Sequence, residues 1–280
     1  GVNPAALPDI LNGIREWFEK QPHLPQGDLD DEVITRRLIT QGFSIERVKE
    51  KLDNYYTMRH KMPEMLCGRD PLSPSVSKCL KQGYWYPLPK KTPNNKRVTI
   101  FRSQNTNDPL TEIIKIAFMI GDYRLWNDDA TGDYWVFDFK HATLNHAMQF
   151  NPVLITKIMF YLNYCYGPKV VAQYLVNLPP FASAIVNLFK KSMKKKMVER
   201  LYVYDSFEDL YKVLPRNIFP KEYGGDEVCY EWKKTFQLPP MREYFLEQEH
   251  VKSDESKRRQ PTKANELFGA AGSFKKLEFD

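Results

Sequence analysis

The sequence predicts an α/β protein that carries an all-helical lobe at its N-terminus. In the first segment, apolar side chains such as Ile10, Ile14 and Trp17 recur at helical spacing, which is typical of amphipathic helices with one buried face. From residue 97 onward, short β-branched and aromatic runs alternate with longer apolar segments. Strands joined through helices of crossover length indicate a sheet with parallel strands.

Three regions are expected along the chain. The N-terminal lobe, residues 1–75, should contain about three helices, at 8–20, from Asp30 or Asp31 to near Gly42, and at 44–61 with Ser44 as its cap. Residues 69–97 hold five prolines around Tyr84-Trp85-Tyr86 and are interpreted as a connector with one short strand. The main domain spans residues 85–245, and a polar, partly ordered tail is expected over 246–280.

Within the main domain the pattern alternates regularly. Strands are expected at 97–102, 134–139, 169–177 and 201–204, and helices at 110–125, 151–166 and 180–198. The helix at 110–125 is apolar over more than one face, which predicts that it is buried on several sides.

Composition narrows the possible partners. The aromatic share is 14%, which suits either a large core or an apolar cavity, and the sequence leaves both open. The net charge of +6 is too small to indicate nucleic acid. Much of the positive charge lies in Lys190–Arg200, where six basic residues accompany one acid, Glu199. Such a run is either a solvated face or a means of approaching anionic lipid headgroups.

The expected setting is the cytoplasm. The four cysteines are scattered without a CxxC pair, no signal peptide is visible, and no apolar run approaches the roughly 20 residues of a membrane span. We therefore expect reduced thiols in a soluble protein, with an N-terminus left by processing or expression.

No catalytic or metal-binding motif is found in the sequence. GxSxG, P-loop, GxGxxG and HExxH patterns are all missing. His141 and His146 have no acidic or thiol ligands beside them, so His146 is interpreted as a hydrogen-bonding residue. Asp138, at a strand end, is interpreted as a cap for the next segment rather than a catalytic group. We expect no enzyme, no cofactor and no metal.

Three separate motifs carry a family resemblance, in the same order as in that family. They are Tyr134-Trp135-Val136-Phe137-Asp138-Phe139 with the following His141 to Gln149, Gly167-Pro168-Lys169-Val170 to Asn177, and Leu214-Pro215-Arg216 to Gly225. Over about residues 10–240 the chain resembles the CRAL-TRIO family, in particular its animal tocopherol and retinaldehyde carriers, and among these the insect branch. The resemblance implies a mixed sheet that floors an apolar cavity, closed by an amphipathic lid helix.

The resemblance also assigns residues to the cavity. The matched wall positions are Ile114, Ala117, Phe118, Gly121, Trp135, Phe137, Ile158, Leu162, Tyr166, Val170 and Gln173. Gln173 stands where relatives tend to be apolar, and a buried amide needs partners. Either a polar end of the cargo or Tyr161 and the backbone can supply them. Trp135 is larger than the family's usual residue and is expected to shorten or reshape the cavity.

The lid implied by the resemblance runs from about Phe181 to Met197. Its inner stripe is expected at Phe181, Ala184, Ile185, Leu188 and Phe189, which equally suit a plain core. Membrane contact is expected at Lys169, Lys194, Lys195, Lys196 and Arg200. Of four positions that grip a phosphoinositide headgroup in the tocopherol branch, Lys169, Lys196 and Arg200 match, whereas the fourth is Val171.

The leading interpretation is an intracellular, monomeric lipid-transfer protein. It would bind one small hydrophobic ligand (a retinoid, tocopherol, carotenoid or similar) and exchange it at anionic, phosphoinositide-containing membranes through transient peripheral contact. Two alternatives remain open: a phospholipid or phosphatidylinositol exchanger, and a non-transferring lipid sensor that recruits a protein partner.

Overall fold

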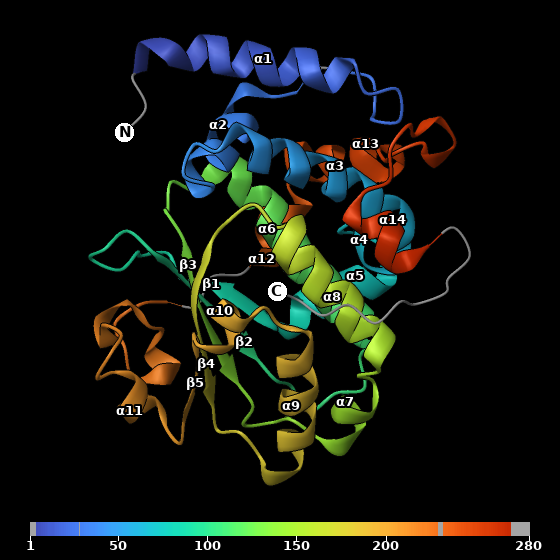
Figure 1. Ribbon diagram of the computed structural model, residues 1–280. Coiled ribbons are helices and arrows are strands. Elements are labelled where there is room, and N and C mark those ends of the chain that lie inside the picture. The colour runs from blue at the N-terminus through green and yellow to red at the C-terminus, as the bar shows by residue number, and fades with distance from the viewer. Residues whose placement is uncertain (1–3, 28, 229–231, 270–280) are drawn as a thin grey trace.

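A computed structural model describes residues 4–27, 29–228 and 232–269. Its centre is a five-stranded mixed sheet in the order β1-β2-β3-β4-β5 (Figure 1). The strands are β1 (Trp85–Pro87), β2 (Arg97–Arg102), β3 (Asp133–Asp138), β4 (Val170–Val176) and β5 (Leu201–Tyr204). β1 is antiparallel to β2, and the other neighbours are parallel. The α/β class and the mixed sheet expected from the sequence are confirmed.

The strand order determines which face the helices cover. Each parallel strand lies beside the one before it, so successive crossovers of the same hand place their helices on one face. These helices are α6 (Leu110–Asn127) after β2, α7 (Leu144–Met148) and α8 (Pro152–Tyr164) after β3, and α9 (Ser183–Ser192) and α10 (Lys195–Val198) after β4. Figure 1 shows α6, α8 and α9 on one side of the sheet and α11 (Phe207–Leu210) on the other.

The two faces of the sheet differ in what they pack against. Side chains that alternate along the strands, such as Val98, Val136 and Tyr174, pack on the α11 side with Leu210 and Phe219. The remaining strand residues point toward α6, α8 and α9. One face is thus an ordinary core, and the other encloses the cavity described below.

The N-terminal lobe consists of α1 (Leu7–Glu19), α2 (Asp31–Thr40) and α3 (Ile45–Lys61). Asp30 caps α2, and the Ser44 side chain accepts a hydrogen bond from the backbone N–H of Arg47 at the start of α3, as expected. A small core that includes Ile14, Leu38 and Leu52 holds these helices together.

The connector contains more structure than the sequence suggested. The helix α4 (Pro63–Leu66) precedes it, and the connector itself forms α5 (Pro74–Gln82) before β1. Pro74 occupies the first turn of α5, where its missing N–H costs nothing, and Gly83 ends the helix in the left-handed conformation at φ 63°. The expected short strand is present as β1, but the helix α5 was not expected, because Pro74 begins a helix there instead of breaking one.

The described part of the C-terminal segment packs on the body of the protein. It contains α12 (Trp232–Gln237), α13 (Pro239–Glu247) and α14 (Lys263–Phe268). Ala264, Leu267 and Phe268 are buried in a cluster with residues of α3, α4, α6 and α8. Arg258 donates to both Asp53 carboxylate oxygens, at 3.1 and 2.9 Å, and fastens this segment to α3.

The lid region is broken rather than continuous. A 3-10 turn at Pro180–Ala182 leads into α9, the chain becomes extended at Met193, and α10 follows. In one continuous helix Lys190 and Lys191 would stand one turn from Lys194 and Lys195, and like charges at that spacing are destabilising. The expected single helix over residues 181–197 was therefore wrong, and the break lets Met193 turn inward, where it is buried.

Candidate functional site

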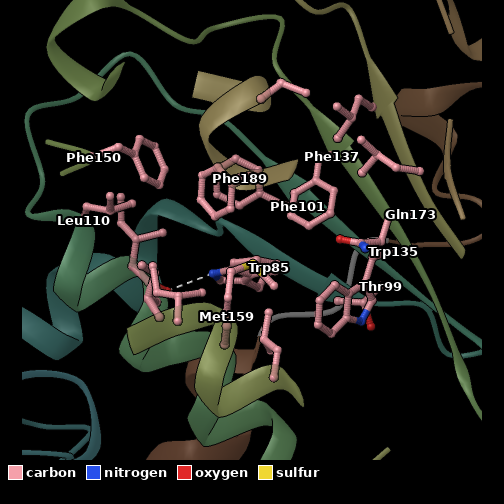
Figure 2. Close-up of a pocket in the computed structure, with 18 of the residues that line it drawn as sticks. Trp85, Thr99, Phe101, Leu110, Trp135, Phe137, Phe150, Met159, Gln173 and Phe189 are labelled. Carbon is pink, nitrogen blue, oxygen red and sulfur yellow. Dashed lines mark hydrogen bonds between the residues drawn. The ribbon is translucent and has the colours of Figure 1, made fainter. Parts of the chain in front are cut away.

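An apolar cavity of about 200 Å³ lies between the sheet and the helices α6, α8 and α9 (Figure 2). Among the described residues its wall is almost entirely aliphatic and aromatic. The lining residues are Trp85, Thr99, Phe101, Leu110, Ile113, Ile114, Ala117, Phe118, Ile120, Arg124, Trp135, Phe137, Phe139, Phe150, Ile158, Met159, Leu162, Tyr166, Gln173, Leu175, Leu178, Ala182, Ile185, Val186, Phe189, Met193 and Leu201.

The sheet supplies the floor of the cavity in rows. The strand register places Thr99 opposite Trp135, Trp135 opposite Gln173, and Gln173 opposite Leu201. Two residues farther along each strand, Phe101, Phe137 and Leu175 form a second row. Because alternate residues of a strand share a face, both rows point into the cavity.

The β1 edge of the cavity is fixed by Trp85. Its indole nitrogen donates a hydrogen bond to the carbonyl oxygen of Ile113 at 2.8 Å (Figure 2). Its ring packs against Phe101 with 4.9 Å between centroids. This contact ties the short edge strand to α6 and closes that side.

A buried polar cluster forms the end wall beside the first row. Arg124 donates to both carboxylate oxygens of Asp133, at 2.9 and 2.6 Å, and its Nε donates to Asp128 at 2.7 Å. The Tyr166 hydroxyl and the Trp135 indole nitrogen also donate to Asp133, at 3.0 and 3.3 Å. Burial, followed by the charge of Asp133, holds the pKa of Tyr166 well above its ordinary value. These donors therefore face Asp133 and stay protonated.

Two other polar side chains of the wall lack such partners. Thr99 and Gln173 are buried, and Thr99 Oγ1 and Gln173 Nε2 have no hydrogen-bond partner. Of the two interpretations left open for Gln173, a bond from its amide nitrogen to Tyr161 or the backbone is not formed.

The α9 side of the cavity presents Ile185, Val186 and Phe189, with Met193 just beyond the helix. Phe189 meets Phe150 edge to face at 5.3 Å between centroids. Leu188 packs in a cluster with Ile155 and Met159 of α8. Ala184 is exposed and points away, so its expected place on the inner stripe was wrong. Phe181 is 36% exposed and lies at the edge of a second hollow.

That second hollow, of about 80 Å³, lies beside the cavity on its α7 side. It shares Phe101, Leu110, Ile113, Phe139, Phe150, Ala182 and Ile185 with the main cavity. Thr143, His146 and Ala147 form its α7 side. The two hollows are therefore adjacent, and their walls together extend from the polar cluster at Asp133 to the segment between α7 and the start of α9.

The wall positions expected from the family resemblance divide into two groups. Ile114, Ala117, Phe118, Trp135, Phe137, Ile158, Leu162, Tyr166 and Gln173 line the cavity. Gly121 and Val170 do not, and their expected place on the wall was wrong. The Tyr166 ring covers Gly121, and Val170 packs at the edge of the core formed by α3, α6 and α8.

Several wall residues were missed from the sequence. Thr99 and Phe101 could have been found, because they alternate along a recognised strand and share a face. Trp85, Phe150 and Met193 lie in a connector, a loop and a helix break, where periodicity gives no orientation. Their position depends on the packing of distant segments.

The basic residues expected at a membrane surround the α9–α10 break and the start of β4. Lys169, Lys195 and Lys196 are exposed, and among the described residues none of them forms an ion pair. Arg200 donates to the Val170 carbonyl oxygen at 3.3 Å. The Lys194 ammonium lies over the Tyr164 ring at 4.2 Å. Val171, at the unmatched fourth position, packs against the backbone near Gly132.

Asp138 and His146, the side chains considered for catalysis and metal binding, take part in structural hydrogen bonds. Asp138 accepts the backbone N–H of Lys140 at 3.0 Å, within the turn after β3, and the Tyr223 hydroxyl at 3.0 Å, while Thr143 caps the following helix α7. His146 accepts the backbone N–H of Thr143, and its other ring nitrogen bonds to the Thr106 carbonyl oxygen at 2.7 Å. Over residues 4–27, 29–228 and 232–269 no His, Cys, Asp and Glu side chains gather in a group that could hold a metal ion.

The cysteine thiols and the lengths of the apolar helices bear on two further expectations from the sequence. Cys67, Cys79 and Cys165 are free thiols, and Cys229 lies outside the described residues. In the part of the chain that the structure describes, no helix has the length and apolar character needed to cross a bilayer.

An α/β sheet that floors an apolar cavity, with helices packed over it, is an arrangement typical of proteins that bind hydrophobic molecules. Residues 81–225 match the CRAL/TRIO domain, and residues 3–76 match the Pinta-like UBA domain. The chain therefore belongs to the CRAL/TRIO family, a family of lipid-binding and lipid-transfer proteins.

Curated relatives and a solved structure agree with this assignment. The chain is 28% identical over 222 residues to the alpha-tocopherol transfer protein-like proteins of Mus musculus, Pongo abelii and Homo sapiens. The match covers 77% of this chain and spans 64% of the length of each relative. The crystal structure of Sfh5 shares the fold, with a TM-score of 0.51 and 16% identity, covering 87% of this chain and 93% of that one.

Proposed function

We propose that the protein is a carrier that holds one small hydrophobic molecule in the cavity beneath α9 and exchanges it at anionic membranes. The observation that carries the proposal is the enclosed, almost wholly apolar cavity. Burying apolar ligand surface contributes about 25 cal/mol per Å², which is sufficient for tight binding without a covalent bond. A retinoid, tocopherol, carotenoid or similar molecule fits this chemistry, and no catalytic step is required.

The surface around α9 supports exchange at a membrane. At its N-terminal end, near α7, the apolar side chains of Leu144 and Met148 are 61% and 73% exposed. At its other end stand the exposed lysines Lys190, Lys191, Lys195 and Lys196. Each basic residue near an anionic surface contributes roughly 1 kcal/mol of attraction. We infer that the lysines bring the protein to the membrane surface, where the exposed apolar side chains of α7 beside the start of α9 enter the interface and α9 moves away from the cavity.

Phosphoinositide selectivity is a finer part of the same proposal. Lys169, Lys196 and Arg200 would contact the headgroup, and Val171 contributes no charge there. Lys194 and Lys195 stand beside them along the chain and would supply the missing charge. We propose that the protein acts as a cytoplasmic monomer with transient peripheral membrane contact.

The test is a transfer assay between vesicles with a fluorescent hydrophobic cargo. Acceptor vesicles contain phosphatidylcholine alone, or with phosphatidylserine, or with a phosphoinositide. The protein should accelerate transfer, and anionic acceptors should increase the rate. The triple variant Lys169→Glu, Lys195→Glu and Lys196→Glu should lose at least about tenfold of that increase while keeping its cargo. A matched control is the triple variant Lys81→Glu, Lys221→Glu and Lys252→Glu, whose exposed lysines lie on α5, beyond α11 and beyond α13.

Other results would point to other functions. Phosphorus in a solvent extract of the purified protein would identify a phospholipid exchanger. Tight cargo binding without any transfer would favour a sensor that recruits a partner. A protein that takes up no hydrophobic molecule would contradict the proposal as a whole.

A further inference from the structure

An open groove of about 330 Å³ lies on the surface where α6 and α8 begin, next to the segment that follows α7. Leu110, Val153 and Leu154 provide its apolar wall. Glu64 and Lys157 also line it, and they pair with each other at 2.7 Å. The groove is thus partly apolar, and this pair gives it no net charge.

A single side chain separates this groove from the main cavity. Among the described residues, Leu110 alone lines both of them. Leu110 and Gln149 also line the second hollow. Figure 2 shows Leu110 at the same end of the cavity as Phe150, opposite the end that holds Gln173. At Leu110 the wall between the solvent and the cavity is therefore one side chain thick.

The segment that holds this part of the wall is lightly anchored. Leu110 is half-buried in the first turn of α6, whose N-cap Pro109 makes no side-chain hydrogen bond. The backbone N–H of Leu110 donates instead to Gln149 Oε1 at 2.7 Å. Gln149 follows α7, and no residue of α7 is buried. Since helix ends fray and partly exposed side chains change rotamer rapidly, a small shift of this segment would let Leu110 turn aside.

The helix α9 is held more firmly than this segment. Phe189 packs edge to face on Phe150, and Leu188 packs in a cluster with α8. Lifting α9 off completely would expose these apolar side chains together, and the cost grows with the apolar area exposed. Turning Leu110 exposes one side chain. A partial shift of α9 would assist it, because Ile185 in the first turns of α9 lines the second hollow beside Leu110.

The surroundings of the groove suit a lipid surface. Val153 in its wall is 40% exposed, and Leu144 and Met148 on the adjoining helix α7 are 61% and 73% exposed. Apolar side chains gathered around one opening are suited to the membrane interface. A hydrophobic molecule that left the cavity at this place would enter lipid without crossing water.

We propose that the groove is the passage by which the hydrophobic cargo moves between the cavity and a lipid surface, and that Leu110 is its gate. This inference rests on the proposed function and adds the route of exchange to it. A gate lies on the path in both directions, so it changes the rates of entry and release by the same factor and leaves the dissociation constant unchanged. A residue that only contacts the cargo changes the dissociation constant, mainly through the release rate.

The test uses N-phenyl-1-naphthylamine, a neutral probe whose fluorescence rises in apolar sites. Stopped-flow mixing gives its association rate constant, and an equilibrium titration gives its dissociation constant. Ala117→Trp, which fills the cavity, should lose binding and so show that the probe enters there. Val153 lines the groove but not the cavity. Val153→Trp should therefore lower the association rate constant at least about fivefold and keep the dissociation constant within about twofold of wild type.

A second variant opens the gate, and each variant has a matched control. Leu110→Ala should raise the association rate constant several-fold. Leu175→Ala removes the same atoms from the cavity wall on β4, away from the groove. It should weaken binding while the association rate constant stays within about twofold of wild type. Val213→Trp, at a site 52% exposed and beyond α11, should leave both constants unchanged.

The outcomes separate the inference from the function on which it rests. An unchanged association rate constant in folded Val153→Trp or folded Leu110→Ala, with the probe bound by wild type, would overturn the inference while the carrier function stands. No binding of the probe by wild type, or undiminished binding by folded Ala117→Trp, would overturn both.

Discussion

The ring of Tyr166 lies directly on the backbone of Gly121, so closely that a Cβ at residue 121 would stand 2.7 Å from Tyr166 Cε2. The contact brings the end of α8 against the middle of α6 and holds the Tyr166 hydroxyl on Asp133. It also explains why Gly121 is not part of the cavity wall, since the ring of Tyr166 takes that place.

Replacing Gly121 should therefore disturb the end wall. Gly121→Ala forces the Tyr166 ring to move, and overpacking of this kind costs about 1–3 kcal/mol of the free energy of unfolding. Urea unfolding followed by circular dichroism measures it. Gly13→Ala is the matched control, because Gly13 is helical, exposed and has nothing within 4 Å of an added Cβ. It should be neutral or stabilising by up to about 1 kcal/mol, and equal losses in the two variants would contradict the packing argument.

The ion pair between Arg124 and Asp133 gives a second prediction. Asp133 is fully buried and accepts hydrogen bonds from Arg124, Tyr166 and Trp135. Asp133→Asn leaves the Arg124 charge with less compensation, and breaking a buried pair in this way costs about 3–5 kcal/mol. Thermal and urea unfolding provide the measurement.

A surface pair on the same segment serves as its control. Asp129, whose side chain is 65% exposed, pairs with Lys91. Asp129→Asn should change the free energy of unfolding by no more than about 1 kcal/mol. If Asp133→Asn lowered the free energy of unfolding by no more than this, the buried ion pair would not stabilise the end wall of the cavity.

Lys51 makes the stability of the protein depend on pH. Its ammonium donates to the Tyr166 carbonyl oxygen at 2.5 Å. Burial, with the positive charges of Arg37 and Lys194, lowers the pKa of Lys51 from 10.5 to about 7. Between these two values the unfolded chain holds the proton and the folded chain has lost it. The free energy of unfolding therefore rises with pH across this window, by up to about 1.4 kcal/mol per pH unit, and below pH 7 the full penalty is present.

The variant Lys51→Met removes this titration. The stability of wild type relative to the variant should increase from pH 7 to pH 9.5, as measured by urea unfolding at several pH values. Curves that stay parallel over this range would show that Lys51 keeps an ordinary pKa.

Much of the fold could be predicted from the sequence because its signals are local. Alternation in Tyr134–Phe139 and the apolar run of Leu110–Leu125 depend only on neighbouring residues, and both elements were predicted correctly. Pro74 misled the prediction, since a proline that breaks one helix is favoured in the first turn of another. The apolar spacing of Leu188, Phe189, Met193 and Met197 continues through the break at Met193, so periodicity predicted one helix.

The site was predictable only in part, for a related reason. The rows on the sheet follow from strand alternation, so Trp135, Phe137 and Gln173 could be placed. The orientation of Ala184 and the covering of Gly121 depend on how α9 and Tyr166 pack against distant elements. Thr99 and Gln173 each have an atom without a hydrogen-bond partner because the neighbouring donors bond to Asp133 instead. No short sequence motif predicts that arrangement.

The most direct test of the account is whether the cavity beneath α9 holds the cargo. Ala117 lines it and Ala184 points outward from α9, so Ala117→Trp should fill the space while Ala184→Trp should not. Each purified protein is incubated with a mixture of retinoids, tocopherols, carotenoids and phospholipids, and its extract is quantified by mass spectrometry. Wild type and Ala184→Trp should each carry one molecule of a hydrophobic compound per chain, and Ala117→Trp, folded by circular dichroism, less than about a tenth of that. An empty wild type, or equal occupancy in a folded Ala117→Trp variant, would contradict the account.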